Sequence, residues 1–586
     1  MSALKMGHSA ALHNPQRTVG GHAPGAGRRH ASRIAHIHAT MHPASRSFRK
    51  GPRPMRDFQR PGRSAVYANE AMAATSHPLA TLTAIETLRA GGNAVDAAIA
   101  AVAVLGLLEP HMTGIGGDCW MLIQRAGDAA PLCYNGTGRA ARGAEPAVPR
   151  LLDEGAVAVP QSHPLAVTIP GAVEAWDRLS TDHGRLGLDR ILAPAIDLAR
   201  AGAPVAPRVA ADWTRHLPLL QSNEITAQSF LAGTRAPAAG TRMPQTQMCR
   251  TLSAIAKDGA RGFYDGWVAD DMLATLKALG GPHEAEDFTG HTGNYVAPAA
   301  GSYRGTRVFE TPPNSQGAIV LALLAMMEPA DIAALDPDGA AFHDLVARAS
   351  EAGIALRDRF LADPADDHGA DDGGLAQIME GARAAAARIA AGGRADPAPE
   401  RPGGSGDTVY VSVVDRDQTA VSMVNSIFHA FGSGITCPRS GVLFNSRGTG
   451  FRLAPGMAGH YRPGLRPPHT LVAGMTGDGR RPVMSFGVMG GHYQAIGHAA
   501  LLSRILDHGL DPQAAIDLPR SMAMGGVLEV ETGADPALMP RLIGLGHRVR
   551  AAAQPLGGAQ AILIDWDRGV LIGGSDPRKD GCALGY

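Results

Sequence analysis

The sequence predicts a layered α/β fold, and three observations indicate this class. Helical and strand-like patterns occur on both sides of one polar, Gly/Pro-rich segment, residues 391–407. A strong period-two strand pattern begins directly after that segment, at Thr408. The most apolar helical run, residues 97–108, has 12 residues, too few to span a bilayer, so it belongs in a core. Two sheets covered by helices are one arrangement that satisfies this pattern.

Composition argues against several other classes of protein. The 586 residues include 54 basic and 54 acidic side chains, but residues 1–54 hold nine of the basic ones and none of the acidic ones. The remainder is mildly acidic and has no sustained basic stripe for nucleic acid. The five cysteines are scattered without a Cys-x-x-Cys pair, which disfavours a disulfide framework or a structural zinc site. We therefore expect a cytoplasmic protein with no metal, no membrane span and no nucleic-acid partner.

The chain divides into an N-terminal extension and a two-part body. Residues 1–54 lack hydrophobic periodicity and the apolar core of a secretory signal, so we interpret them as a disordered basic extension or as residues upstream of a true start at Met55. A transit-like or nucleic-acid-binding arm and a His-rich metal tract remain the alternatives. The body comprises residues 55–407, including the linker, and residues 408–586.

In the first part of the body, the sequence pattern predicts two helices before the first strand. Leu79, Leu82, Ile85 and Leu88 form one apolar stripe of a helix that ends at Gly91. Asn93 can cap the next helix, over 95–108. A Gly-rich loop over 114–118 leads into a strand at 120–123. Further helices are expected to begin at Pro170 and to cover 191–201 and 340–361.

The second part of the body is rich in strands. From Thr408, alternate residues fall on two faces, with Val409, Val411 and Val413 on one of them. Asp415–Gln418 make a turn, and 419–424 run back as a second strand. Further strands are expected at 441–445, 482–486 and 527–531, a hairpin at 561–572 and a helix at 496–508.

Thr408 stands where an N-terminal nucleophile could be unmasked. A threonine that opens a buried strand, after a linker ending in Asp407, could attack through its hydroxyl and use its own freed α-amine as base. The alternative is an ordinary hairpin that follows a surface loop. Zinc-protease, P-loop and Gly-x-Ser-x-Gly signatures are absent from the sequence, and Asn135-Gly-Thr-Gly-Arg139 is too weak a dinucleotide fingerprint to imply a cofactor.

A set of short motifs in a fixed order carries a family resemblance. They are Ser76–Leu79, Gly91–Ala98, Gly114–Asp118, Thr168–Trp176, Phe263–Gly266, Pro312–Gly317, Asp407-Thr408, Phe431–Gly434, Gly490-Gly491 and Ser575–Arg578. On these motifs the chain, from about Ala65 to Tyr586, resembles the γ-glutamyltransferase (γ-glutamyl transpeptidase) family of N-terminal nucleophile hydrolases.

The resemblance implies a four-layer αββα sandwich made as one precursor. Cleavage between Asp407 and Thr408 would give a large and a small subunit, and a homo-oligomer of such pairs is left open. Thr408 would attack the amide carbonyl of a small-molecule substrate, and water or an acceptor amine would resolve the acyl-enzyme. The N–H groups of Gly490 and Gly491 match the oxyanion hole, and no cofactor is implied. Ser426 would hold Thr408 in place, unless it is a solvent-facing serine at a strand end.

The substrate-binding positions depart from those of family members that act on glutathione. Those members bind the α-carboxylate with an Arg and a Ser-Ser pair, and the α-amine with a set that includes an Asp. Here Asn135 stands where that Arg would fall, with Arg139 displaced downstream, and His469-Thr470 replaces the Ser-Ser pair. Gly450 stands in place of the Asp, and Phe428 in place of a polar neighbour.

These departures favour an anionic substrate without an amine. A cationic amine would meet Arg447 and no carboxylate, a mismatch that costs several kcal/mol when partly desolvated. A substrate carboxylate would instead pair with Arg447 or Arg139. The pattern Asn445-x-Arg447-Gly-x-x-Phe451 resembles the branch of oxamate amidohydrolase and glutaryl-cephalosporin acylase-like proteins. A solvated surface arginine is the alternative interpretation of Arg447, and Tyr461 is expected as a lid tyrosine over the site.

We therefore expect a self-processing threonine amidohydrolase that acts on an oxamate-like or glutaryl-like amide. The first alternative is a γ-glutamyltransferase or glutathione hydrolase. The second alternative is an unprocessed, non-catalytic family member that serves as a binding scaffold.

Overall fold

The computed structural model describes residues 56, 62–145, 147–366, 371–394 and 406–586. The basic extension expected over residues 1–54 lies outside this range, as does most of the expected linker, residues 395–405. The expected division into these segments is therefore not tested by the described residues.

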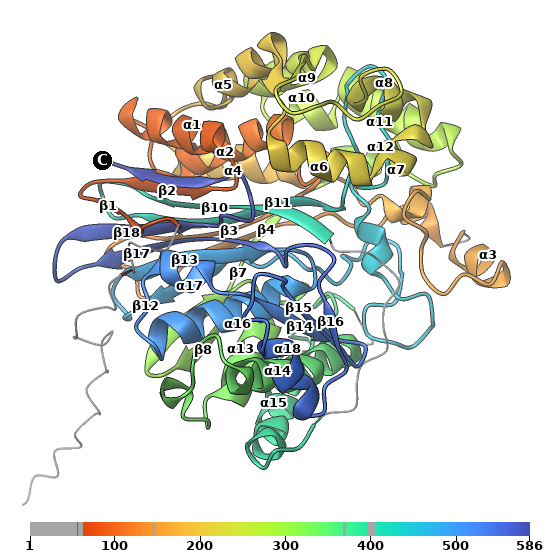
Figure 1. Ribbon diagram of the computed structural model, residues 1–586. Helices are drawn as coiled ribbons and strands as arrows, with labels where there is room; N and C mark the ends of the chain where they lie inside the picture. Colours follow the sequence, from red (N-terminus) through yellow and green to blue (C-terminus); the bar gives the residue numbers. More distant parts are fainter. Residues whose placement is uncertain (1–55, 57–61, 146, 367–370, 395–405) are drawn as a thin grey trace, which may run out of the picture. The chain divides into compact units, whose positions relative to one another are not determined.

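Two seven-stranded antiparallel sheets face each other at the centre of the described body (Figure 1). The β13 sheet has the order β1 (Val66–Ala68), β18 (Val570–Ser575), β17 (Gly558–Asp565), β13 (Pro482–Met489), β12 (Gly474–Gly477), β9 (Thr306–Glu310), β8 (Ala299–Tyr303). The β10 sheet has the order β19 (Cys582–Gly585), β2 (Met72–Thr75), β10 (Gly406–Val414), β11 (Ala420–His429), β3 (Asp118–Gln124), β4 (Leu132–Gly136), β7 (Asn294–Val296).

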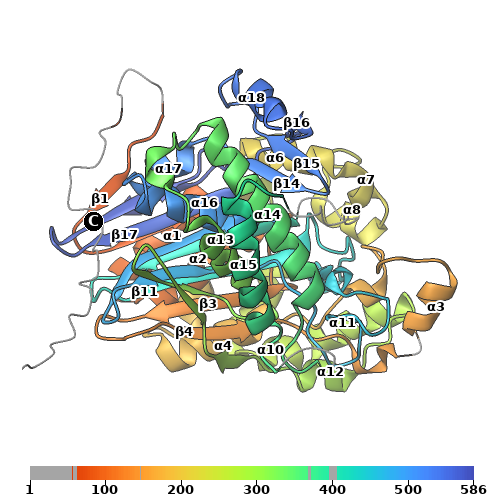
Figure 2. The same ribbon diagram turned by 90° about the horizontal axis from the view of Figure 1, so that it is seen from below.

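Helices cover the outer face of each sheet (Figures 1 and 2). The helices on the β10 sheet are α1 (Pro78–Arg89), α2 (Ala94–Leu108) and α4 (Ala172–His183), with α5 (Leu188–Ala201) and α9 (Thr246–Asp258) outside them. Those on the β13 sheet are α13 (Gly317–Met327), α16 (Tyr493–Leu506) and α17 (Pro512–Asp517), with α14 (Ala340–Phe360) and α15 (Leu375–Ala390) outside them. This arrangement confirms the expected αββα sandwich. A small sheet of β14 (Ser521–Met524), β15 (Val527–Val530) and β16 (Val549–Ala551) lies apart from these two.

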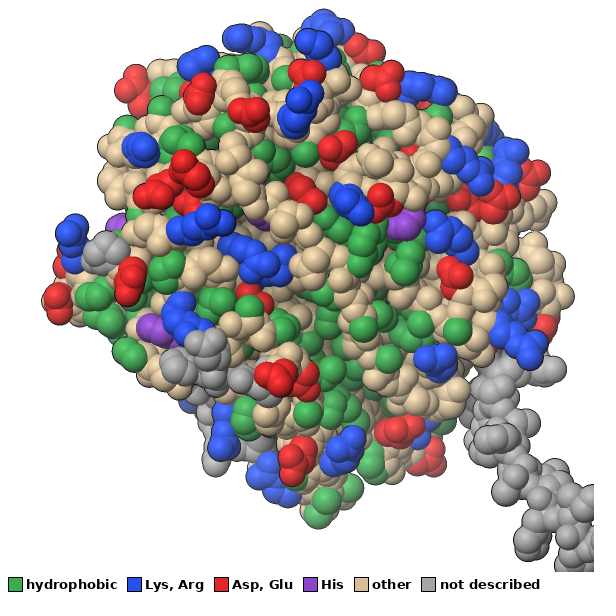
Figure 3. Space-filling view, turned by 180° about the vertical axis from the view of Figure 1, so that it is seen from behind, with side chains coloured by type: hydrophobic (Ala, Val, Ile, Leu, Met, Phe, Trp, Pro, Cys, Tyr) green, Lys and Arg blue, Asp and Glu red, His purple; other side chains and the backbone are tan. Residues whose placement is uncertain are grey.

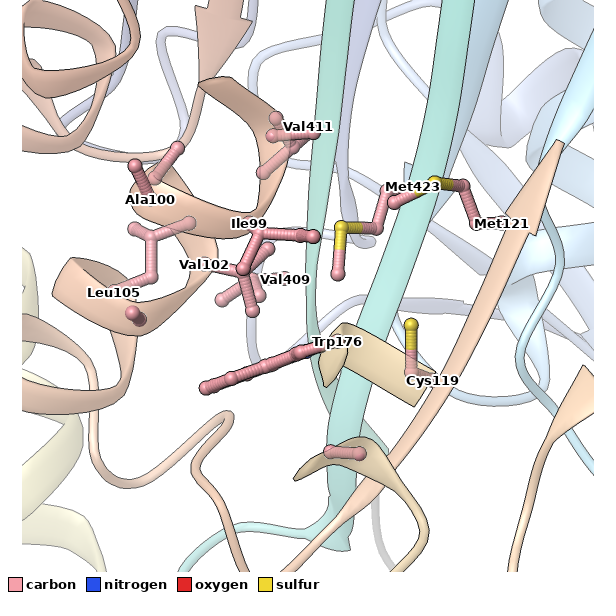
Figure 4. Close-up of a cluster of buried hydrophobic side chains, with 14 of the residues drawn as sticks. Ile99, Ala100, Val102, Leu105, Cys119, Met121, Trp176, Val409, Val411 and Met423 are labelled. Carbon is pink, nitrogen blue, oxygen red and sulfur yellow. The ribbon is translucent and has the colours of Figure 1, made fainter. Parts of the chain in front are cut away.

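The two faces expected for the strand after Thr408 are both present in β10. Val409 and Val411 point toward Ile99 and Val102 of α2, in the core between helix and sheet (Figure 4). Ser412, on the opposite face, donates a hydrogen bond of 2.8 Å to the Ser485 hydroxyl of the β13 sheet. Helix α2 begins as expected, because Asn93 forms a reciprocal capping box at its first turn.

Two local expectations were wrong. Residues 441–445 form no strand; Leu443 makes only an isolated bridge with Thr436, because Gly441 has φ +72° and turns the chain. Leu82 does not belong to the buried stripe of α1, since its side chain is 42% exposed. Ile85 and Leu88 of the expected stripe are buried, together with Ala84.

The surface in Figure 3 carries basic and acidic side chains interspersed with one another. Basic groups are therefore not gathered into one stripe on that face. Among the described helices, none combines the length and apolarity needed to cross a membrane.

Truncating Ile99 should destabilise the protein, because this fully buried side chain fills the space between α2 and β10. We expect Ile99→Ala to lower the free energy of unfolding by about 2–5 kcal/mol, the usual range for a cavity of this size. Leu82→Ala, on the exposed side of α1, is the matched control and should change the free energy of unfolding by only about 0.5 kcal/mol. Urea denaturation measures both, and equal losses would contradict this packing.

Candidate active site

Thr408 lies at an irregularity in the β10 sheet. Asp407 pairs with Phe428 and Val409 pairs with Asn425, so Thr408 alone faces the two intervening residues of β11. Such a bulge re-aims the side chains around it. Phe428 has φ +79°, which is unusual for an aromatic residue and locates backbone strain beside Thr408.

The Thr408 hydroxyl is fully buried, and two polar side chains of the described residues contact it. Gln494 Nε2 donates to Thr408 Oγ1 over 3.1 Å, and Oγ1 donates to Ser426 Oγ over 3.4 Å. Ser426 Oγ in turn accepts the Phe428 N–H at 2.8 Å. The structure thus brings Ser426 to Thr408, and its complete burial contradicts the alternative of a solvent-facing serine.

Gly490 and Gly491 follow the strand that faces β10. Ser412 of β10 contacts Ser485 of β13, and the Tyr410 ring lies against Gly487. Moving two residues back along β10 therefore corresponds to moving two residues forward along β13. This register directs Thr408 toward the end of β13, where the two glycines begin. Their φ angles of +120° and +58° are costly for other residues, and a Cβ on Gly490 would meet the Gly557 backbone.

Arg447 lies wholly inside the protein, which contradicts the alternative of a solvated surface arginine. Its Nη1 donates to Thr470 Oγ1 over 3.2 Å, and its guanidinium lies 4.3 Å from the centre of the Phe428 ring. Its Nε is 3.4 Å from Asp118 Oδ2, and His469 Nε2 is 3.5 Å from the same oxygen. These side chains form a buried cluster, called the Arg447 pocket from here on and made of Arg447, Asp118, His469, Thr470 and Phe428.

The expectation that Arg447 has no neighbouring carboxylate was therefore wrong. Asp118 supplies one, from the first position of β3, and its Oδ1 accepts the Gly138 N–H at 2.7 Å. Sequence reasoning quoted Asp118 as the end of a Gly-rich motif but assigned it no role. A polar residue that ends a tight loop and opens a buried strand is the signal that could have identified it.

The Arg447 pocket holds one positive and one negative charge at neutral pH. Burial opposes ionisation of Asp118, but the nearby His469 imidazole, 3.5 Å away, and the positive charge of Arg447 outweigh it and lower the pKa of Asp118. Burial lowers the pKa of Arg447 to about 10, opposed by Asp118, which leaves the guanidinium charged. Burial, aided by Arg447, lowers the pKa of His469 to about 4, so this imidazole is neutral.

Several polar atoms of the Arg447 pocket lack hydrogen-bond partners. Among the described residues, Arg447 Nε and Nη2 and Asp118 Oδ2 have none. Leaving a buried donor unsatisfied costs about 1–3 kcal/mol, and more when it is charged. The pocket is therefore suited to a ligand that supplies an acceptor for the guanidinium.

The other predicted binding residues have partners of their own. Asn135 donates to Asn314 Oδ1 over 3.1 Å, and Arg139, which is 37% exposed, lies 3.7 Å from Asp363. The Tyr461 hydroxyl donates to the Leu165 carbonyl over 3.1 Å, and its ring belongs to a small apolar cluster with Phe451. Within the described part of the chain, no hydrogen bond or ion pair joins these three side chains to Thr408 or Arg447.

Two buried glutamines at the site were missed at the sequence level. Gln494 touches Thr408, and Gln316 Nε2 donates to the carbonyls of Gly491 and Thr470 over 3.0 and 2.9 Å. Gln316 lies inside the Pro312–Gly317 motif, and Gln494 lies three residues after the glycine pair. Position near a motif was the available signal, but an amide side chain has no sequence pattern that marks it as functional.

Comparison with known proteins settles the family. A sequence profile described as gamma-glutamyltranspeptidase matches residues 80–586. The chain belongs to the γ-glutamyltranspeptidase family. The glutathione hydrolase-like YwrD proenzyme of Bacillus subtilis is 34% identical over 89% of this chain and 99% of that protein. The oxamate amidohydrolase proenzyme of Klebsiella pneumoniae is 32% identical over 89% of this chain and its own full length.

Solved structures agree with this membership of the γ-glutamyltranspeptidase family. The crystal structure of a cephalosporin acylase from Bacillus halodurans superposes with a TM-score of 0.82 at 31% identity, covering 92% of this chain and 98% of that one. Relatives of the family are named as hydrolases, amidohydrolases and acylases, so the expected enzyme class is confirmed at this level.

Replacing His469 should reduce the loss of stability in acid. The pKa of His469 is about 4 when folded and about 6.5 when unfolded, so the unfolded chain takes up the proton first as the pH falls. Stability attributable to this group is therefore complete above pH 6.5 and is lost between about pH 6.5 and 4. Between pH 6.5 and 4, the free energy of unfolding of His469→Asn should therefore fall by roughly 2–3 kcal/mol less than that of the wild type, as measured by urea denaturation. Identical losses in both proteins would contradict a neutral, buried His469.

Proposed function

We propose that the protein is a self-processing threonine amidohydrolase that cleaves the amide of a small carboxylate-bearing substrate, of oxamate-like or glutaryl-like type. The observation that carries the proposal is the buried, incompletely paired Arg447 close to Thr408. Phe428 links the two, since its ring lies under the guanidinium and its N–H bonds Ser426, the neighbour of Thr408. The relatives named oxamate amidohydrolase and cephalosporin acylase support the same reaction class.

Self-processing would begin with attack of Thr408 Oγ1 on the carbonyl carbon of Asp407. The Oγ1–C bond forms, the C–N bond to Thr408 breaks, and the hydroxyl proton passes to the departing amine. Water then hydrolyses the ester, so that Asp407 ends as a carboxylate and Thr408 regains its hydroxyl. The product carries an α-amine next to the hydroxyl, the arrangement that serves as base in threonine nucleophiles.

Turnover would reuse the same oxygen on the substrate amide. The freed amine accepts the hydroxyl proton as Oγ1 bonds the carbonyl carbon, and the leaving amine takes that proton when the C–N bond breaks. N–H groups at Gly490 and Gly491 are the candidates for stabilising the oxyanion, each donor typically worth about 10²–10³ in rate. Water then releases the acid and restores Thr408.

The substrate carboxylate would bind at the Arg447 pocket. A carboxylate can accept both Nε–H and Nη2–H of a guanidinium, the two donors that lack partners here. The neutral His469 and the Thr470 hydroxyl line the same pocket without adding charge.

Glutathione hydrolysis is the second candidate, favoured by Asp118. Its Oδ2 has no hydrogen-bond partner among the described residues and could accept an N–H from the α-amine of a γ-glutamyl group. A panel of oxamate, glutaryl anilide, γ-glutamyl anilide and glutathione separates the candidates. Faster turnover of glutathione and the γ-glutamyl anilide would favour the second candidate over the first.

Thr408→Ala should abolish both processing and activity, because it removes the attacking oxygen. Denaturing gels of the purified wild type should show two fragments, whereas the variant should give one full-length band. Mass spectrometry of the small fragment should find Thr408 as its first residue. A Thr408→Ala protein that still splits before residue 408 would refute the nucleophile, and a wild type that stays whole would favour a non-catalytic scaffold.

Removing the charges of the Arg447 pocket should discriminate against anionic substrates. The double variant Arg447→Met/Asp118→Asn avoids leaving one buried charge unpaired. We expect it to lower kcat/KM for a glutaryl anilide by about 10–100-fold relative to an uncharged acyl anilide of similar length, since a bond to a charged group contributes about 1.5–3 kcal/mol.

Arg139→Met is the matched control, because Arg139 is half-exposed and paired with Asp363. It should change the ratio of the two kcat/KM values less than about threefold. A larger effect at Arg139, or equal losses on the charged and uncharged anilides in the double variant, would remove Arg447 from the substrate site. Two bands on a gel confirm that each variant folds and processes.

A further inference from the structure

Gln494 occupies an unusual position for an amide side chain. It is the second residue of α16, directly behind the Gly490-Gly491 turn, and it is completely buried. Its side-chain amide contacts the Thr408 hydroxyl at one end and the Val472 backbone at the other. Neither the charge pairing of the Arg447 pocket nor the oxyanion turn accounts for it.

The orientation of the Gln494 amide follows from its partners. The Val472 N–H lies 2.9 Å from Oε1 and can only donate, so the oxygen of the amide must point toward it. The NH₂ group is thereby directed at Thr408 Oγ1, 3.1 Å away. A flipped amide would set two donors against each other at Val472.

This contact determines where the Thr408 hydroxyl hydrogen goes. Oγ1 accepts one hydrogen bond from Gln494, and its own hydrogen is directed to Ser426 Oγ. Ser426 Oγ is fixed in turn by the Phe428 N–H. The nucleophile therefore has a single hydroxyl orientation in the precursor, which reduces the entropy to be lost on reaching the transition state.

We propose that Gln494 is a catalytic residue, whose amide N–H stabilises negative charge on Thr408 Oγ1. The inference rests on the proposed function of Thr408 as nucleophile. Charge develops on this oxygen twice, when the hydroxyl loses its proton during attack and when Oγ1 leaves the ester during hydrolysis. A fixed, buried donor acts on both steps without giving up its own proton.

The segment His469–Val472 links this donor to the Arg447 pocket. Thr470 contacts Arg447 through its hydroxyl, and Val472 anchors the Gln494 amide through its N–H. Gln316 holds both the Thr470 and Gly491 carbonyls. Groups that would bind the substrate and groups that would act on the nucleophile thus share one short stretch of backbone.

Gln494→Glu tests the donor while keeping the shape of the side chain. One carboxyl oxygen can still accept the Val472 N–H, but the other donates to Oγ1 only when the carboxyl is protonated. Burial raises the pKa of such a carboxyl. The processing rate of the variant divided by that of the wild type should therefore fall at least about tenfold between pH 5 and pH 8.

The measurement uses precursor made by cell-free synthesis, transferred to buffers of pH 5 to 8 and sampled on denaturing gels. Gln494→Ala should process at least about tenfold more slowly than the wild type, with a ratio that does not vary with pH. Gln513→Glu is the matched control, since Gln513 is also buried and bonds the backbone of Ser575 and the Asp517 carboxylate, away from Thr408. Its ratio to the wild type should show no decline with pH.

A pH-independent ratio in Gln494→Glu, or wild-type processing in Gln494→Ala, would overturn the assignment of Gln494. If Gln494→Glu fails to fold by circular dichroism, the Gln494→Ala rate decides alone. Thr408→Ala, measured in parallel, distinguishes a failure of the proposed function from a failure of the role assigned to Gln494. Splitting of Thr408→Ala would refute the proposed function, whereas an intact Thr408→Ala precursor with unaffected Gln494 variants would refute only the role of Gln494.

Discussion

The register between the two sheets is the constraint on which the site depends. Thr408 lies in one sheet and the glycine pair follows a strand of the other, so the register of β10 against β13 sets where the nucleophile lies relative to the glycines. Buried hydroxyls hold that position, since Tyr410 and Ser412 both contact Ser485, which itself donates to the Val421 carbonyl. An apolar interface would tolerate slippage, whereas a slipped polar one would leave buried groups unsatisfied.

The Arg447 pocket contains a buried ion pair that is only partly hydrogen-bonded. A lone buried guanidinium would be very costly, and Asp118 offsets that cost without satisfying every donor. Arg447 Nε and Nη2 therefore keep unused hydrogen-bonding capacity in a place from which water is excluded. The cation also rests on the Phe428 ring, whose own strained backbone lies beside Ser426.

The sequence was sufficient for features written into local patterns. The alternation after Thr408 predicted both faces of β10, and Asn93 predicted the start of α2, because period and capping depend on neighbouring residues. The Arg447–Asp118 pair was not predictable in this way, since β3 and the turn at Arg447 meet only in the folded chain. The strand predicted for residues 441–445 failed for a related reason. Their composition suits a strand, but the N–H groups of Phe444 and Asn445 donate to the carbonyls of Ile435 and Gly116, which belong to loops.

The ladder at the start of β10 has a consequence for activation. Gly406 and Asp407 pair with His429 and Phe428, so the peptide before Thr408 is part of a sheet rather than a free loop. In the intact chain that stretch of backbone leads directly into the nucleophile, which is wholly buried. Breaking the bond before Thr408 would leave Asp407 as a chain end that is no longer tied to the nucleophile. The same event that creates the α-amine of Thr408 would then also loosen the backbone beside its hydroxyl.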